Sequence, residues 1–384
     1  MNEDKAARYQ RLKRYIAVGS VIWTVAILVG LLWSGASVWL RQSAELVAHG
    51  RDATRAAREA PPLVVVALYV VILVLVTETA TLPLSLYSGF ILERRYGLST
   101  QRLGGWFIDQ VKSLAIGLVL ATTAAMTVYS LIRRFPNNWW LPAGLLFAVV
   151  IVGLTRLAPV LLLPLFYSVR PLGRDSLRAR LVALARRAGA DVLGAYEWGM
   201  GSKTRKAHAA LAGLGATRRI LVSDTMLADY SEDEIEVVLA HELAHHVHGD
   251  IWKGIGFESL LFVAGCYAAS RALAALAPVF GLRGVDDVAG VPLLMLAAGA
   301  VSFVTLPVAH AMSRSFERRA DTFALELTRN PGAFTSAMRR LAMQNLAEER
   351  PSKLVEWLFY SHPPFRDRIA AADAWRSQSP PVAS

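Results

Sequence analysis

Cysteine is almost absent from this sequence, since Cys266 is the only one in 384 residues. A single cysteine excludes an intrachain disulfide, and it leaves the redox state of the compartment undetermined. Cys266 lies inside an apolar stretch. We therefore interpret it as a small core residue.

Charged residues are also scarce. Asp, Glu, Lys and Arg make up 18% of the chain, 54% is apolar, and the mean hydropathy is +0.38. This composition excludes an ordinary soluble domain and predicts a protein that crosses the lipid bilayer several times. Acidic residues are outnumbered 30 to 41 by Lys and Arg. Because these basic residues lie mostly between apolar runs rather than in one patch, nucleic acid is not an expected partner.

Long apolar runs, in contrast, are abundant. Six of them approach the roughly 20 residues that a helix needs to cross the hydrocarbon core. They are residues 15–40, 63–84, 111–131, 139–165, 254–280 and 288–312. The first run follows several basic residues, as in a signal peptide, but it is too long for an h-region. We expect it to be an uncleaved anchor.

The crossings divide the chain into four regions. They are an N-terminal membrane region with four transmembrane helices at 1–169, a catalytic region at 170–250, two further transmembrane helices at 251–312, and a second catalytic region at 313–384. An even number of crossings behind a basic N-terminus predicts that both termini and both catalytic regions are cytoplasmic. Four arginines of the first connecting loop oppose this orientation, namely Arg41, Arg51, Arg55 and Arg58.

Local patterns predict the elements of the first catalytic region. Residues 175–187 have helical periodicity, and residues 195–200 and 219–222 have the composition of strands. The strands are joined through Gly213 and Gly215, which favour a hairpin turn. Ser231 and Glu234 have the spacing of a capping box, so the next helix is predicted to begin at Ser231.

That helix carries His241-Glu242-Leu243-Ala244-His245. Residues four apart on a helix lie about 6 Å from each other along the axis on one face, so both imidazoles can reach one metal ion. Zinc held by two histidines and a carboxylate keeps one position open for water and lowers the pKa of that water toward about 7. Glu242 would accept the water's proton as a general base. The alternative is a solvated helix with paired His and Glu.

Two residues are candidates for the third ligand. Glu317 and Asp321 are four apart on a predicted helix at 313–327, which places Asp321 on the face where it can support a ligand histidine. Glu258 lies within an apolar run, where an ionisable residue is itself a functional candidate. We prefer Glu317, with one Zn²⁺ per chain as the cofactor.

Two other classes of zinc peptidase are excluded by their motifs. A metzincin needs a glycine and a third histidine at positions that here hold His248 and Ile251. A site-2-type protease carries its motif within a membrane helix. Here the helix begins in the polar run Ser231-Glu232-Asp233.

Several further motifs occur in a fixed order between about residues 82 and 369. They are Leu82-Pro83-Leu84-Ser85-Leu86-Tyr87 with Glu93 and Gly97, Pro164-Leu165-Phe166, Ser223-Asp224-Thr225-Met226-Leu227, the H-E-x-x-H run, and Ser313-Arg314-x-x-Glu317-x-x-x-Asp321. The set resembles the integral-membrane zinc CAAX prenyl proteases of the a-factor-converting type, together with their HtpX-like relatives. The resemblance implies zinc ligation by His241, His245 and Glu317, catalysis by Glu242, and support of a ligand histidine by Asp321. It also implies membrane helices that enclose a hollow chamber.

The resemblance extends to a His-Pro pair followed by an arginine near the C-terminus, matched here by His362-Pro363-Pro364 and Arg368. It implies that His362 and Arg368 donate to the oxyanion of the tetrahedral intermediate, a role that suits electrostatic stabilisation. The alternative is a turn with a solvated histidine and a surface arginine.

One position departs from the family pattern. The strand beside the substrate typically has Asn-Ala, where this chain has His208-Ala209. Main-chain pairing of an edge strand with an extended peptide would be retained, because it does not depend on the side chain. We expect His208 and Ala209 to bind substrate, with His208 lining the cleft.

The expected fold is mostly α: a polytopic membrane helical bundle or chamber with a gluzincin-type H-E-x-x-H catalytic domain containing a small β-hairpin or sheet. The expected function is that of a zinc metalloendopeptidase. Its protein substrates are either prenylated C-terminal peptides or misfolded and membrane-associated proteins, and we prefer the latter, in a bacterial inner membrane with the site facing the cytoplasm. The alternative is a catalytically silent membrane protein that uses the same fold for binding or assembly.

Overall fold

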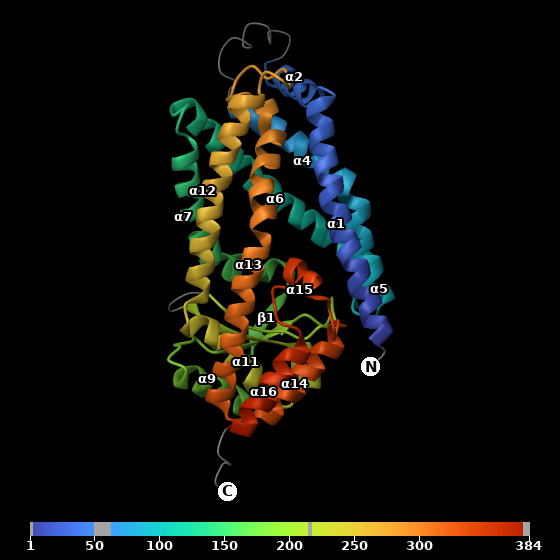
Figure 1. Ribbon diagram of the computed structural model, residues 1–384, viewed down its shortest axis with the longest axis vertical. Helices are drawn as coiled ribbons and strands as arrows, with labels where there is room; N and C mark the ends of the chain where they lie inside the picture. The colour runs from blue at the N-terminus through green and yellow to red at the C-terminus, as the bar shows by residue number, and fades with distance from the viewer. Residues whose placement is uncertain (1–2, 50–62, 214–216, 379–384) are drawn as a thin grey trace.

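The computed structural model describes residues 3–49, 63–213 and 217–378. The molecule is elongated, with long helices in its upper part and a small sheet among shorter helices at its lower end (Figure 1). The first helix starts near the lower end and runs toward the other end of the molecule. The start of the chain and the sheet therefore lie on the same side of the long helices.

The elements in chain order are α1 (Glu3–Trp33), α2 (Ala36–His49), α4 (Leu63–Leu86), a π-helix (Tyr87–Ile91), α5 (Leu92–Arg95), α6 (Leu103–Arg134), α7 (Trp140–Leu161), α8 (Leu163–Phe166), β1 (Ser168–Pro171), α9 (Asp175–Arg187), β2 (Ala195–Gly199), β3 (Ala209–Ala212), β4 (Arg219–Ser223), α10 (Asp224–Asp229), α11 (Glu232–Val247), α12 (Asp250–Leu276), a 3₁₀ turn (Val288–Gly290), α13 (Val291–Thr328), α14 (Pro331–Gln344), α15 (Lys353–Phe359) and α16 (Phe365–Gln378). The predicted mostly helical class is confirmed.

Five helices of the described chain are long and apolar enough to cross a membrane. They are Lys5–Trp33, Leu63–Arg95, Leu103–Arg134, Asp250–Leu276 and Val288–Thr328. A sixth predicted run, at 139–165, coincides with α7, of which Trp140–Thr155 counts as a shorter apolar helix. Large apolar side chains such as Phe303 and Val304 face outward on α13, as expected where lipid replaces water.

Two predicted boundaries within the long helices are wrong. The first run does not continue to residue 40, because the chain breaks between α1 and α2 at Gly35, whose φ of +73° suits a residue without a Cβ. The predicted division between residues 312 and 313 is also absent. A single helix of 38 residues, α13, continues from the apolar region to the lower domain.

The membrane helices pack around their own core and enclose a cavity. The cavity has a volume of about 420 Å³ and lies between α4, α6, α7, α12 and α13. Its lining is mainly apolar, and among the described residues Glu258 of α12 is the only carboxylate in it. The structure thus places this rival ligand candidate in the wall of a membrane cavity.

At the end remote from the sheet, four charged side chains form a cluster between α2 and the loop before α13. Arg41 of α2 is 4% exposed and pairs with Asp287, and Arg283 pairs with Glu45 of α2. The Arg41 charge is therefore neutralised inside the protein rather than free in a loop. The other arginines of the predicted loop, Arg51, Arg55 and Arg58, lie outside the described residues.

The lower domain is built on a four-stranded sheet of order β1-β2-β4-β3. β2 and β4 are parallel, whereas β1–β2 and β3–β4 are antiparallel. The predicted strands at 195–200 and 219–222 therefore do not form a hairpin with each other. The antiparallel pair that is joined through Gly213 consists of β3 and β4. Gly213 has a φ of +94°, and a Cβ there would lie 2.7 Å from the carbonyl oxygen of Thr217. Gly215 lies outside the described residues. β3 is an edge strand.

α11 packs against one face of this sheet. The predicted capping box is confirmed, because Ser231 Oγ accepts from the Glu234 N–H and the Glu234 carboxylate accepts from the Ser231 N–H. Ile235, Leu239 and neighbouring residues of α11 are buried in one core with β4. Each fully buried Leu or Ile contributes about 1.5–3 kcal/mol, so the helix that carries the motif is firmly anchored.

Candidate metal centre

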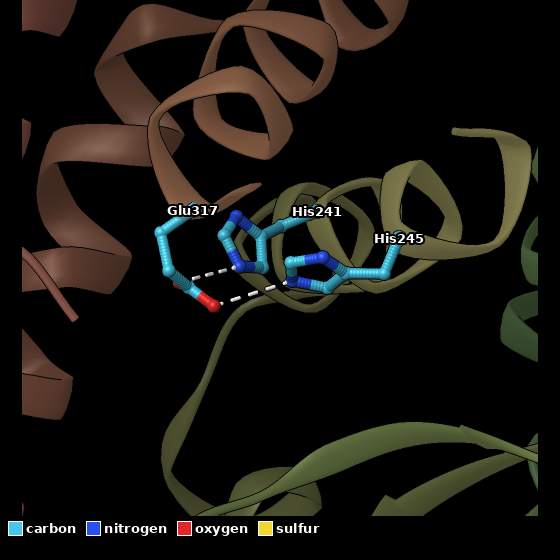
Figure 2. Close-up of side chains that lie close together, drawn as sticks. All are labelled: His241, His245 and Glu317. Atoms are coloured by element: carbon cyan, nitrogen blue, oxygen red, sulfur yellow. Dashed lines mark ion pairs between the residues drawn. The ribbon is translucent and has the colours of Figure 1, made fainter. Parts of the chain in front are cut away.

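Three predicted ligands converge where α11 meets α13. Figure 2 shows the two imidazoles of α11 directed at the carboxylate of Glu317. His241 Nε2 lies 3.2 Å from Glu317 Oε2, and His245 Nε2 lies 3.3 Å from Glu317 Oε1. The three ligand atoms all lie within 4.8 Å of one another, and His241 is only 6% exposed.

The donor set fits a zinc ion. Two imidazole nitrogens and one carboxylate oxygen are the ligands of many catalytic zinc sites. Glu317 Oε2 is buried, and no described residue gives it a hydrogen bond of good geometry. This is the only such group of three among residues 3–49, 63–213 and 217–378, and it includes Glu317 rather than Glu258.

A second carboxylate fixes the orientation of His241. Asp321, one turn after Glu317 on α13, has its Oδ1 2.9 Å from His241 Nδ1. A proton on Nδ1 shared with Asp321 leaves the lone pair of Nε2 free for a metal. Asp321 therefore lies where the four-residue spacing on α13 predicts it.

Arg368 of α16 holds Asp321 in turn. Its Nε and Nη2 donate to the two carboxylate oxygens of Asp321 at 2.8 and 2.5 Å, a bidentate pair. Arg368 is 7% exposed, so the alternative of a surface arginine is wrong. Its Nη2 also lies 3.3 Å from His241 Nδ1. The predicted oxyanion role of Arg368 stays a prediction.

His245 has a supporting carboxylate that the sequence reasoning missed. Asp250 Oδ2 lies 3.1 Å from His245 Nδ1, and Asp250 is itself buried and paired with Arg319. The chain brings Asp250 back to the histidine through Gly249, whose φ is +68°. The available signal was an acidic residue directly after a glycine at the end of the motif helix.

Glu242 and His245 border a cleft of about 340 Å³. The cleft also contacts Glu317 and, from the edge strand β3, Leu211. Burial raises the pKa of Glu242, and the neighbouring imidazoles partly offset the effect. A carboxylate with a raised pKa is a stronger proton acceptor than one in water.

Carboxylate neighbours raise the proton affinity of both motif histidines. Burial opposes a charge on His241, but the nearby carboxylates of Asp321 and Glu317 outweigh this and raise its pKa to about 9. The pKa of His245 is raised as well, because its hydrogen bonds to Glu317 and Asp250 outweigh burial and the repulsion from His241. A metal ion that binds here therefore competes with protons.

The sequence comparisons identify the family. Residues 2–168 match the family model described as "CAAX prenyl protease N-terminal, five membrane helices". Residues 171–376, more than half of the chain, match "Peptidase family M48". The chain belongs to peptidase family M48. M48 proteins are zinc metalloproteases, so the predicted family and the predicted metalloprotease activity are confirmed.

Individual M48 relatives agree with this assignment. "Uncharacterized metalloprotease YhfN" of Bacillus subtilis is 33% identical over 309 residues, 79% of this chain and 72% of the relative. "Probable CAAX prenyl protease 1" of Schizosaccharomyces pombe is 28% identical over 78% of this chain, which spans 64% of that protein. The crystal structure of S. mikatae Ste24p has the same fold, with a TM-score of 0.86 at 21% identity over 97% of this chain and 89% of that one. The chain is an integral membrane metalloprotease.

The C-terminal histidine of this M48 chain reaches the site from the side of the solvent. His362 Nε2 lies 3.3 Å from Glu317 Oε1, although 60% of the His362 side chain is exposed. Its Nδ1 is 2.9 Å from the Ser361 hydroxyl. The structure thus shows a solvated histidine that also lies beside Glu317. The predicted oxyanion role of His362 stays a prediction.

The predicted substrate residues separate onto the two faces of the sheet. Ala209 packs against the core that contains α11. His208, one residue earlier, has its ring 6.3 Å from that of Trp198. The cleft that contains Glu242 is contacted by Leu211 but not by His208. His208 directly precedes the strand that was predicted to lie beside the substrate. It nevertheless lies away from the cleft that it was expected to line.

Proposed function

We propose that this chain is a zinc endopeptidase in which His241, His245 and Glu317 hold one Zn²⁺. The observation that carries the proposal is the convergence of three ligand atoms within 4.8 Å. When bound, zinc would supply Lewis-acid chemistry, polarising the scissile carbonyl and lowering the pKa of the attacking water. Asp321 and Asp250 support the two histidines with their Nε2 atoms directed at Glu317.

Glu242 moves the protons of the reaction. It accepts a proton from water as the water oxygen attacks the peptide carbonyl, and then delivers that proton to the amine as the C–N bond breaks. The raised pKa of Glu242 favours this transfer. His362, beside Glu317 and open to solvent, is the proposed donor to the oxyanion. Arg368 acts with it through its charge and by holding Asp321.

The substrate peptide pairs with β3. This strand lies at the edge of the sheet and contributes Leu211 to the wall of the cleft that contains Glu242. An extended peptide added beside an edge strand gains main-chain hydrogen bonds and presents one peptide group to the site. Ala209, at the start of β3, would contact the peptide mainly through its backbone.

The proposed substrates are misfolded or membrane-associated proteins, in a bacterial inner membrane with the site in the cytoplasm. The basic start of α1 lies at the same end of the molecule as the site (Figure 1), which supports a cytoplasmic site. The similarity to a bacterial metalloprotease supports the bacterial membrane. Prenylated C-terminal peptides are the second candidate, favoured by the name of the fission yeast relative.

The two substrate classes are tested with matched peptides that do or do not carry a prenyl group. Purified protein and its Glu242→Gln variant are compared in the same detergent. Cleavage of both peptides, abolished in the variant, supports broad specificity. Cleavage of the prenylated peptide alone supports the second candidate. Absence of cleavage by zinc-loaded protein would contradict the endopeptidase proposal.

A further inference from the structure

A second depression lies on the opposite face of the sheet from α11. It is an apolar groove of about 380 Å³ between the strands and the short helix α8, where the chain leaves α7. The residues used in the argument below are Leu163 and Phe166 of α8, Trp198 of β2, Leu221 of β4, and Ala210 and Ala212 of β3. We refer to it as the sheet groove. None of the predicted site residues lines it.

The register of the sheet determines which residues of β3 face this groove. Ala209 is opposite Val222, which is buried in the core shared with α11. Ala210 is opposite Leu221, which lines the sheet groove. Because side chains alternate along a strand, Ala210 and Ala212 face the groove. Leu211 faces the cleft that contains Glu242.

β3 is therefore shared by two depressions, one on each face. A peptide added at its free edge would lie about 4.8 Å from β3, with successive side chains directed to alternate faces. Peptide side chains on the α11 face would lie beside the cleft that contains Glu242. Peptide side chains on the other face would lie over the sheet groove. A peptide bound for cleavage thus brings alternate side chains to the groove.

We propose that the sheet groove is a specificity subsite that binds a large apolar side chain of the substrate peptide. This inference rests on the proposed function, since it assumes that a peptide pairs with β3. The groove is continuous with that edge, because two of its lining residues belong to β3. Both are alanines, so the side of the groove nearest the peptide is left open by small side chains.

The lining and its charged surroundings define the chemistry of the occupant. The rest of the wall includes Trp198, Leu221 and Phe166, which carry no charge that could pair with an occupant. At the α8 end, the Lys203 ammonium lies 5.7 Å from the Phe166 ring centre, and that of Lys112 lies 5.9 Å from it. Lys203 is itself paired with Asp109. The apolar wall leaves the charge of a Lys or Arg occupant without a partner, whereas Leu, Phe or Trp would bury apolar surface.

His208 does not supply a charge at the other end. It precedes β3 and lies beside Trp198. Burial, with the nearby charge of Lys206, lowers the pKa of His208 and so disfavours a charge on the ring. The groove is then apolar along its length.

The test uses a peptide series in which each position flanking the scissile bond is in turn Ala, Leu, Phe or Lys. We expect a position on the groove side to favour Leu or Phe over Ala by on the order of 10-fold to 100-fold in kcat/KM, with Lys disfavoured. Affinity is measured separately, by anisotropy of labelled peptides bound to the Glu242→Gln protein. This isolates binding from the chemical step.

Two variants change the groove in opposite directions. Ala210→Phe fills it from β3 and should remove the preference for Leu and Phe. Leu163→Ala enlarges it from α8, without touching the strand, and should shift the preference toward Phe. Opposite shifts from the two variants would support the subsite.

Other results would overturn it. If all peptides lose affinity equally in Ala210→Phe, the residue has a structural role and the subsite is rejected. The same conclusion follows if the unsubstituted enzyme cleaves the peptides without any preference, as expected if a lipid chain occupies the groove, and then the endopeptidase proposal survives alone. If no peptide is bound or cleaved by zinc-loaded protein, both proposals fail together.

Discussion

The molecule contains two charge clusters built around buried side chains, one at each end, and they are built differently. In the remote cluster, Arg41 and Arg283 are matched by Asp287 and Glu45. In the site cluster, carboxylates outnumber the cations that face them. These carboxylates are Glu242, Glu317, Asp321 and Asp250, whereas the neighbouring cations are Arg368, Arg319 and the half-exposed Lys253.

This difference separates structural pairing from a binding site. A buried cluster with matched charges needs nothing further, whereas an excess of buried carboxylate is unfavourable until a cation neutralises it. In the metal-free protein, a proton on His241, whose pKa is raised to about 9, contributes positive charge there. A divalent ion would replace it. The comparison therefore predicts that substitutions at the site cluster change metal binding, and those at the remote cluster change stability.

The largest effect is expected at Glu242. Glu242→Gln removes the proton acceptor but keeps the shape of the site, so kcat should fall by roughly 10²–10⁴-fold. Zinc content, measured by elemental analysis, should remain that of the unsubstituted protein. Loss of zinc in this variant would instead make Glu242 a ligand.

The next effect concerns the third ligand. Glu317→Gln should weaken zinc binding by about 100-fold or more, because it removes a charged ligand from the first coordination sphere. Glu258→Gln is the matched control, since Glu258 lies in the membrane cavity. Zinc titration against a competing chelator measures both. Weakened binding in the control alone would reverse the ligand assignment.

Smaller losses are expected from the supporting carboxylates. Asp321→Asn and Asp250→Asn should each weaken zinc binding by about 10–100-fold. Asp287→Asn, in the remote cluster, should leave zinc binding unchanged. It should instead destabilise the fold by about 3–5 kcal/mol, because it leaves Arg41 buried without its partner. Thermal unfolding in detergent checks the second effect, and equal zinc loss in all three variants would contradict the comparison.

The smallest expected effect is the change in apparent zinc affinity for each unit of pH. His241 has its pKa raised from 6.5 to about 9 in the metal-free site, so zinc must displace its proton at pH 7. Apparent zinc affinity should therefore rise by up to about tenfold per pH unit between pH 7 and 9 for that one proton. By the same linkage, protonated His241 stabilises the metal-free fold. This contribution to the free energy of unfolding is fully present below pH 6.5 and is lost as the pH rises through about 9. Affinity that is flat across this range would contradict a protonated His241.

Local features of the sequence predicted much of the site. Ser231 and Glu234 gave the start of α11 because a capping box involves residues only three apart. The four-residue spacing of the motif histidines, and of Glu317 and Asp321, is enough to place each pair on one helix face. The bounds of α9 were likewise predicted from its periodicity.

The features that were missed depend on contacts between distant segments or on a backbone reversal. Asp250 reaches His245 only because the chain reverses at Gly249. The side of the sheet that His208 faces is set by the pairing of β3 with β4, which no residue of β3 specifies alone. α13 continues past residue 312 because a helix satisfies its backbone in lipid and in water alike.

A decisive experiment is the zinc stoichiometry of the purified enzyme, followed through removal and return of the metal. We expect one zinc per chain, loss of peptide cleavage when a chelator removes it, and recovery on addition of one equivalent of zinc. Full cleavage by protein shown to be metal-free would contradict the assignment of His241, His245 and Glu317 as a catalytic zinc site.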